Sequence, residues 1–316
     1  MTSLRERDET SSVRQSVWRG SLPLRIELDK ADCRTYDESD PYLIHFERLS
    51  YLGLLIPRLH AFFADRLIFP DINPTEAWLS FERVPLKWHY PLGLLYDLYS
   101  GTEPAGPVHT EGGEDDVTDT TPLQWKLTVH FSEYPKELVK LDADGKILHD
   151  LYINSVKEAD YLRNGNGRTV MSLSEKDSTQ LWDGVRQHDS QLFQPINQKL
   201  LNPSGVTLRH LPVKLYLPHA SSTSSSAIQE DNEAAPGSLR VVQALITPSA
   251  SNRQPQTIGT ALNQILPELF PSRRQPLLAQ AVLHGSTLPL TVSVEELVRA
   301  VAYLDGWLHV AVVMMA

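Results

Sequence analysis

Cysteine is almost missing from this chain: Cys33 is the single cysteine among 316 residues. One cysteine excludes internal disulfides and any cluster of thiolate metal ligands, and it agrees with a reducing compartment. Cys33 could act as a nucleophile, but a lone cysteine more often serves as a small buried apolar side chain. The chain therefore has to stabilise its fold without covalent cross-links.

Long hydrophobic runs are missing as well. No stretch approaches the roughly 18 consecutive apolar residues that a membrane-spanning helix needs. The segment from Met1 to Gln15 is charged and lacks the apolar core of a secretion signal, and its acidic residues argue against a mitochondrial presequence. We therefore expect a cytoplasmic protein.

The chain also lacks an excess of positive charge and the common catalytic motifs. The formal net charge is −10 and no run of Lys and Arg offsets it, so nucleic-acid binding is not expected. No glycine-rich phosphate loop, His-Glu-x-x-His helix or Gly-x-Ser-x-Gly elbow occurs, and the 11 histidines are scattered. We expect no metal, no cofactor and no catalytic residue, because metal ligands normally cluster with recognisable spacing.

The hydrophobic pattern divides the chain into three parts, of which the first is residues 1–140. Alternation of apolar and polar residues over 22–28 and 125–131 predicts strands. Pro57 stands where a helix can begin, with a buried stripe formed by Leu59, Phe62, Phe63 and Leu67. We expect an N-terminal segment and a first lobe, interrupted by an acidic loop at about 101–122.

Residues 141–205 have the period of amphipathic helices instead. Ser174 is a candidate N-cap for one of these helices, because its hydroxyl can accept a hydrogen bond from a free backbone N–H. Pro195 predicts a kink or a break in another helix, since proline removes a backbone donor. This part is expected to be a helix-rich domain.

The strand period returns over residues 206–316. Alternation over 211–217 predicts a strand, and a capping box beginning at Ser293 predicts a helix. A Ser-rich stretch at about 219–237 is typical of a loop. The order of elements repeats that of the first lobe, which predicts an α+β fold with two β-grasp (ubiquitin-like) domains flanking the helix-rich domain.

One lysine is expected opposite the apolar face of a helix. At roughly 100° per residue, Lys157 lies about 180° from Leu148. The residues within about 80° of Leu148 are Leu151, Tyr152, Ser155, Val156, Ala159 and Leu162. Most lysines on an outward face serve only to keep a helix solvated. An exposed amine nevertheless has the access that an acceptor of a covalent modifier needs.

Several segments resemble the autophagy protein 5 family. The most specific are Val84–Asp97, which contains Pro-Leu-Lys-Trp-His-Tyr-Pro, and Val156–Asp160, which contains Lys-Glu-Ala-Asp. Val17–Gly20, Trp125–Phe131 and Gln180–Gly184 match further segments in the same order. The resemblance covers nearly the whole chain, which is identified as a fungal-type member, although its acidic and Ser-rich loops depart from the shorter members.

This resemblance implies a subunit of a conjugation system. In the family, the lysine of the Lys-Glu-Ala-Asp motif, here Lys157, forms an isopeptide bond with the C-terminal glycine of the ubiquitin-like modifier autophagy protein 12. The family also binds the N-terminal helix of autophagy protein 16, and conjugating enzymes contact it transiently. The complex promotes conjugation of autophagy protein 8 to phosphatidylethanolamine during autophagosome formation.

The resemblance therefore implies a non-catalytic subunit of an E3-like complex. It also implies a location in the cytoplasm and at the membrane of the preautophagosomal structure, with peripheral contact only. We expect the autophagy protein 16 helix to bind an apolar groove between the lobes, because a helix docks its apolar face into an apolar trough.

Two alternatives stay open. The chain could be a non-conjugated adaptor whose two lobes only dock helices, with Lys157 an ordinary surface residue. It could also be a thiol enzyme that uses Cys33. The sequence offers that thiol no adjacent base and places an acid, Asp32, next to it, which disfavours the reactive thiolate.

Overall fold

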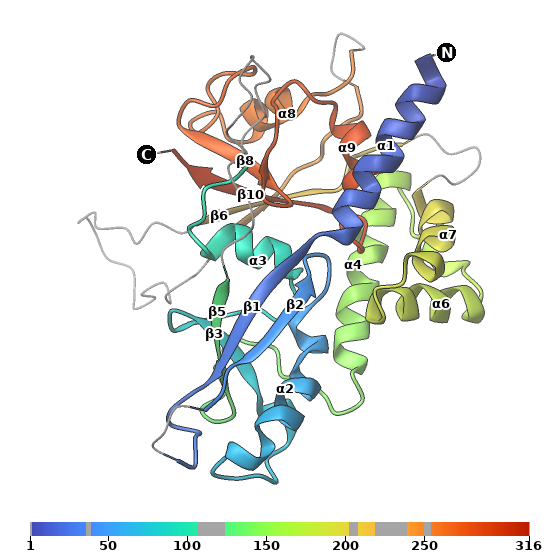
Figure 1. Ribbon diagram of the computed structural model, residues 1–316. Coiled ribbons are helices and arrows are strands. Elements are labelled where there is room, and N and C mark those ends of the chain that lie inside the picture. The colour runs from blue at the N-terminus through green and yellow to red at the C-terminus, as the bar shows by residue number, and fades with distance from the viewer. Residues whose placement is uncertain are drawn as a thin grey trace, which may run out of the picture.

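The computed structural model describes residues 2–35, 39–105, 124–201, 208–218, 239–249 and 254–315, with side chains described from Thr10 onward. In this part of the chain, two five-stranded sheets form two lobes with a group of helices beside them (Figure 1). The Ser-rich stretch and most of the acidic stretch that were predicted as loops lie outside the described residues.

Lobe 1 is a mixed sheet with the strand order β2-β1-β5-β3-β4. Its strands are β1 (Ser21–Leu28), β2 (Tyr42–Glu47), β3 (Trp78–Phe81), β4 (Val84–Pro85) and β5 (Trp125–His130). Its helices are α2 (Ile56–Phe63) and α3 (Leu92–Tyr99), with the short 3-10 helices η1 (Leu52–Leu54), η2 (Ala64–Arg66) and η3 (Pro74–Glu76). The central strand β1 runs antiparallel to β2 and parallel to β5.

Lobe 1 follows the predicted pattern closely, with one departure at α2. Every second residue of β1 is buried, because successive side chains of a strand point to opposite faces. Leu59 and Phe63 lie on the buried side of α2, as predicted, but Phe62, which was predicted on the same side, is 46% exposed. Leu67, which was expected on the same stripe, lies beyond the end of the helix.

Lobe 2 repeats this topology, with the order β7-β6-β10-β8-β9. Its strands are β6 (Val213–Pro218), β7 (Leu239–Gln243), β8 (Ala279–Leu283), β9 (Ser286–Thr287) and β10 (Leu308–Met314), and its helices are α8 (Ile258–Ile265) and α9 (Val294–Val301). The first strand again lies inside the sheet, antiparallel to its hairpin partner β7 and parallel to the last strand β10. Ser293 caps α9 as predicted, accepting a hydrogen bond from the backbone N–H of Glu296.

The helix-rich part consists of α4 (Lys146–Asn164), α5 (Arg168–Met171), α6 (Glu175–Arg186) and α7 (Ser190–Leu201). Ser174 caps α6, as predicted. Of the kink or break predicted at Pro195, the break does not occur, because α7 continues through this residue. Phe193, Ile196 and Leu200 are buried on α7, which packs against α6, so tertiary packing outweighs the loss of one backbone hydrogen bond.

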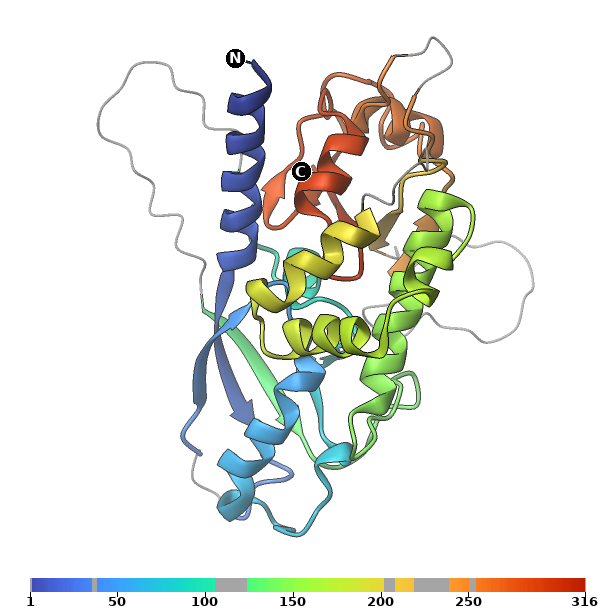
Figure 2. The ribbon, with the colours of Figure 1, turned by 90° about the vertical axis from the view of Figure 1, so that its right-hand side faces the viewer.

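Helix α1 (Thr2–Arg19) was not predicted. Its sequence is polar and offers no continuous apolar stripe, so its periodicity carries no helical signal. The helix packs against α9 of lobe 2 (Figure 2), and the ring of Trp18 at its end stacks on His188 at 4.5 Å. Contacts with distant segments therefore support this helix.

The two lobes also touch each other directly. Helix α3 of lobe 1 packs on β8 and β10 of lobe 2 (Figure 1). Arg48 and Asp97 form an ion pair that is almost fully buried, and Asp97 also accepts a 2.9 Å hydrogen bond from the backbone N–H of Gly285 in lobe 2. No helix in the described ranges has both the length and the hydropathy needed to cross a bilayer.

Candidate functional site

The candidate site lies on α4, whose two ends are well defined. Gly145 and Gly165 flank the helix with φ values of 69° and 72°, a backbone conformation that glycine adopts without strain. At the N-terminus the carboxylate of Asp142 accepts hydrogen bonds from the backbone N–H groups of Ile147 (3.0 Å) and Lys146 (2.9 Å). The Ile147 bond in particular lowers the pKa of Asp142, which stays ionised and complements the helix dipole.

The inward face of α4 is partly as predicted and partly polar. The apolar residues that are buried on it are Leu148, Tyr152, Val156 and Ala159. Toward the C-terminal end the same face buries Asp160, Arg163 and Asn164, which the apolar pattern did not indicate. Because buried polar groups are costly unless they are hydrogen-bonded, this end of α4 has to be matched to specific partners.

Asp160, the last residue of the Lys-Glu-Ala-Asp segment, has a structural role. Its side chain is fully buried and accepts hydrogen bonds from Asn164 Nδ2 (2.6 Å) and from the backbone N–H of Val170 in α5 (3.1 Å). The carboxylate therefore ties α5 to α4. It is not available as a base for chemistry at the neighbouring lysine.

Arg163 is buried between α4 and lobe 2. Its Nη1 donates a 3.3 Å hydrogen bond to the carbonyl oxygen of Gly306. Burial lowers the pKa of Arg163 to about 10, although the nearby Asp160 and Asp305 act in the opposite direction. The guanidinium is therefore still charged at neutral pH, and its attraction to Asp160 and Asp305 favours α4 remaining against lobe 2.

A buried network clamps the middle of α4 to lobe 2. Ser155 Oγ donates to Asp305 Oδ2 (2.7 Å), and His309 Nε2 lies 2.9 Å from the same oxygen. His309 Nδ1 lies 2.8 Å from the hydroxyl of Tyr216, and the backbone N–H of Trp307 donates to Asp305 Oδ1 (3.2 Å). Burial disfavours the charged form of Asp305, but His309 and the hydrogen bonds outweigh it and lower the pKa.

Lys157 lies on the outward face of α4, opposite this clamp. Its side chain is exposed, as the helical period predicted. Among the described residues, none forms a hydrogen bond or ion pair with its ammonium. Asn154 and Tyr161, three residues before it and four after it, are also exposed on this side of the helix. The arrangement presents a primary amine on the outward face of a helix whose inward face is hydrogen-bonded to lobe 2.

A second lysine lies beside this surface and was not singled out from the sequence. Lys214 of β6 has its Nζ 3.3 Å from Glu158 Oε2 and 4.0 Å from the centroid of the Trp307 ring. No local sequence signal could have identified it, because the residues that hold it are far away in the chain. The Trp307–Gly306–Asp305 turn carries a weak signal at most, an Asp-Gly dipeptide typical of turns.

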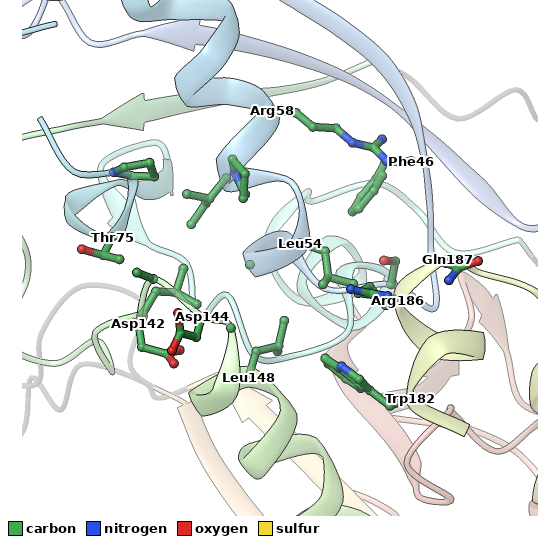
Figure 3. A pocket seen from close by; sticks show the side chains of 18 of the residues that line it. Phe46, Leu54, Arg58, Thr75, Asp142, Asp144, Leu148, Trp182, Arg186 and Gln187 are labelled. Atoms are coloured by element: carbon green, nitrogen blue, oxygen red, sulfur yellow. The ribbon is translucent and has the colours of Figure 1, made fainter. Parts of the chain in front are cut away.

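A pocket of about 660 Å³ lies between lobe 1 and the helices, not between the two lobes. Apolar side chains, among them Leu54, Leu148 and Trp182, line it, and Figure 3 shows Arg58 and Arg186 on one side of it and two acidic side chains near the start of α4 on another. Such a trough, apolar inside and charged at its edges, suits the apolar face of an amphipathic helix.

The surroundings of Cys33 differ from the prediction. The residue is partly exposed rather than buried, and its Sγ lies 3.8 Å from Thr35 Oγ1. The neighbouring Asp32 is buried and accepts a 2.7 Å hydrogen bond from the backbone N–H of Phe131, which gives this acid a structural role. No group of three His, Cys, Asp or Glu side chains able to hold a metal ion occurs within the described ranges.

Three family models match the chain. They are described as the UblA domain, the alpha-helical bundle region and the UblB domain of autophagy protein ATG5, and they match residues 17–131, 145–203 and 210–312. The α+β fold with two ubiquitin-like domains flanking a helix-rich domain is therefore confirmed.

Curated relatives and a solved structure agree with these matches. Autophagy protein 5 of Phaeosphaeria nodorum is 62% identical over 316 residues, covering 98% of this chain and 99% of the relative. Autophagy protein 5 of Aspergillus terreus is 47% identical over 312 residues, covering 96% and 98%. The crystal structure of Kluyveromyces marxianus Atg5 has a similar fold, with a TM-score of 0.70 at 18% identity over 95% of this chain and 98% of that one.

Proposed function

Because the chain belongs to the autophagy protein 5 family, and so has its role in autophagy, we propose that Lys157 is the acceptor of the modifier autophagy protein 12. The observation that carries the proposal is the exposed ammonium of Lys157, which no described residue engages. The surrounding Lys-Glu-Ala-Asp segment resembles the acceptor motif of the family. We further assign residues 1–140, 141–205 and 206–316 to its three structural units.

The proposed reaction is an acyl transfer from a conjugating enzyme. The Lys157 amine attacks the thioester carbonyl that joins the C-terminal glycine of the modifier to a cysteine of that enzyme. A C–N bond forms, the C–S bond breaks, the thiolate leaves, and the amine loses a proton. Because a solvated lysine is protonated at neutral pH, the base that removes this proton comes from the conjugating enzyme.

In this reaction the chain positions the Lys157 amine and supplies no catalytic group. Ser155 and Tyr152 hydrogen-bond to Asp305 and to the carbonyl oxygen of Leu304, which hold the inward side of α4 against lobe 2. The amine two residues after Ser155 is thereby carried on a rigid element. A fixed acceptor loses less conformational freedom when it meets the modifier, which favours the transfer.

We also propose that the pocket between lobe 1 and the helices receives the N-terminal helix of autophagy protein 16. The apolar interior around Leu54 and Trp182 would take the apolar face of that helix, and the basic and acidic edges would fix its direction. The assembled E3-like complex would then promote transfer of autophagy protein 8 to phosphatidylethanolamine, at the preautophagosomal structure and with peripheral membrane contact only.

Reconstituted conjugation tests the acceptor role. The reaction contains the modifier, its activating and conjugating enzymes and either wild-type chain or Lys157→Arg, and branched peptides are mapped by mass spectrometry. We expect a single linkage at Lys157 in the wild type and none in Lys157→Arg, with the fold of both intact by circular dichroism. No linkage would support the non-conjugated adaptor instead, and a linkage that the substitution leaves unchanged would place the acceptor at another residue.

Charge reversal at the pocket edge tests the docking role separately. Arg58→Glu combined with Arg186→Glu should abolish binding of the autophagy protein 16 helix and phospholipid transfer, while conjugation at Lys157 continues. Arg168→Glu, at an exposed residue of α5 outside the pocket, is the matched control and should leave binding intact. Unchanged binding in the double variant would place the docking site elsewhere.

A further inference from the structure

Lys214 is held in place on two sides. Its Nζ lies 3.3 Å from the carboxylate of Glu158 and 4.0 Å from the centroid of the Trp307 ring, and its side chain is only 17% exposed. The parallel register of β6 and β10 pairs Lys214 with His309, two residues after Trp307, and residues two apart along a strand lie on the same face. The strand pairing therefore determines this contact.

The Trp307 ring is itself fixed. It is fully buried, and its Nε1 donates a 2.9 Å hydrogen bond to the backbone carbonyl oxygen of Ser155 in α4. Its backbone N–H is bonded to Asp305. The ammonium of Lys214 thus meets a carboxylate and the face of an immobile aromatic ring, both of which attract its positive charge.

Lys157 has the opposite surroundings. It is exposed on α4, and the acid next to it in the sequence, Glu158, is engaged by Lys214. Lys157 thus precedes Glu158 on α4 and Lys214 reaches the same acid from β6, so the two lysines differ in how freely their amines can move. An acyl transfer needs an amine that can lose its proton and approach the thioester carbonyl.

We propose that Glu158 and Trp307 determine the site of conjugation by holding Lys214 out of the reaction. This inference rests on the proposed function of Lys157 as the acceptor. The held amine would have to break its ion pair and leave the ring before it could attack a thioester, whereas Lys157 can attack directly. Glu158 is thus a specificity-determining residue and takes no part in the chemical step.

Amine labelling tests the restraint on the chain alone, without any conjugation enzyme. A limiting amount of an acetylating reagent modifies the lysines, and mass spectrometry gives the rate at each one. Glu158→Gln should raise the labelling rate of Lys214 by about 2- to 5-fold, the range expected when one partly exposed ion pair is lost and the contact with the Trp307 ring remains. Asp177→Asn is the matched control, since it releases Lys199 from a 3.0 Å ion pair on other helices.

Conjugation in the Lys157→Arg background tests the consequence. Lys157→Arg alone should give no product, whereas Lys157→Arg with Glu158→Gln should give a branched peptide at Lys214. Adding Lys214→Arg should remove that product, and Lys157→Arg with Asp177→Asn should give none at Lys199.

The outcomes separate the two proposals. Wild-type product at Lys157 together with no Lys214 product in Lys157→Arg with Glu158→Gln would overturn the specificity role and leave the acceptor role standing. An unchanged labelling rate of Lys214 in a folded Glu158→Gln chain would overturn it as well. Absence of wild-type product at Lys157 would remove the acceptor role, and the specificity role with it.

Discussion

Trp307 Nε1 donates a 2.9 Å hydrogen bond to the backbone carbonyl oxygen of Ser155, two residues before Lys157 in the same helix. The bond joins the turn before the last strand of lobe 2 to the middle of α4. The same ring faces the ammonium of Lys214 at 4.0 Å. One buried aromatic residue thus helps to position the helix that carries the proposed acceptor and to restrain the lysine beside it.

Trp307→Phe should therefore loosen the contact between α4 and lobe 2. The substitution removes the indole donor and part of a buried ring, and we expect it to lower the free energy of unfolding by about 1 to 3 kcal/mol in a denaturant titration. Trp78→Phe is a control of the same kind, because Trp78 also donates to a backbone carbonyl but is partly exposed. Equal losses in both variants would contradict a special role for Trp307.

The contact between the lobes should depend on Asp97. Asp97→Ala leaves the buried guanidinium of Arg48 and the N–H of Gly285 without their acceptor, and removing one partner of a buried pair costs about 3 to 5 kcal/mol of unfolding free energy. Asp177→Ala breaks an ion pair at the surface with Lys199 and should cost less than about 1 kcal/mol. Chemical denaturation of both variants measures the difference, and a similar small loss for Asp97→Ala would refute the prediction.

Stability should fall as the pH decreases from about 6.5 to 4. Burial lowers the pKa of His89 and of His284 to about 4 in the folded chain, whereas an unfolded histidine has a pKa of about 6.5. The unfolded chain therefore takes up protons first, and the folded state loses roughly 1 to 3 kcal/mol per histidine across this range.

Thermal midpoints at pH 7.5, 6 and 5 measure this loss. His284→Gln should flatten the pH dependence, because glutamine does not titrate in this range. Its amide can still donate to the Val301 carbonyl oxygen, which the imidazole contacts at 2.8 Å. The exposed His45 provides the control, and His45→Gln should leave the slope as it is in the wild type. A midpoint that does not change with pH in the wild type would show that these rings are not kept neutral by burial.

Gly259 at the start of α8 should tolerate no side chain. A Cβ at this position would lie 2.0 Å from the carbonyl oxygen of Arg273, a backbone atom that cannot move alone. We expect Gly259→Ala to destabilise the chain by more than about 4 kcal/mol or to prevent folding, as measured by denaturation or soluble yield. Gly167→Ala, whose Cβ would meet only Met171 Sδ at 3.8 Å, should fold normally.

Local chemistry was sufficient to predict many elements of this fold. The alternation of β1 and β5, the caps at Ser174 and Ser293 and the outward position of Lys157 all follow from the spacing of residues a few positions apart. Such features are decided by the two periods of regular backbone and by hydrogen bonds to free N–H groups, so they survive in any tertiary context that buries the apolar side.

The predictions that were wrong concern residues whose environment is set from a distance. Pro195 does not break α7, because burial of Phe193 and Ile196 against neighbouring helices offsets the missing bond. Helix α1 has no apolar stripe of its own and ends where Trp18 stacks on His188. Cys33 is partly exposed, at a bridge to Leu67 that no short-range pattern indicates.

The sequence by itself determined that Lys157 stands on the solvated side of an amphipathic helix, because helical geometry places it opposite Leu148 whatever that face packs against. Only the tertiary structure decided that a second lysine, Lys214, pairs with Glu158, the acid that follows Lys157 in the sequence. Lys214, Glu158 and Trp307 come from three separate parts of the chain. The parallel pairing of β6 with β10 places Lys214 near Trp307, and the hydrogen bond from Trp307 to the Ser155 carbonyl oxygen joins α4, which carries Glu158, to them. Strand register over such a distance depends on the packing of a whole sheet, which no local spacing encodes.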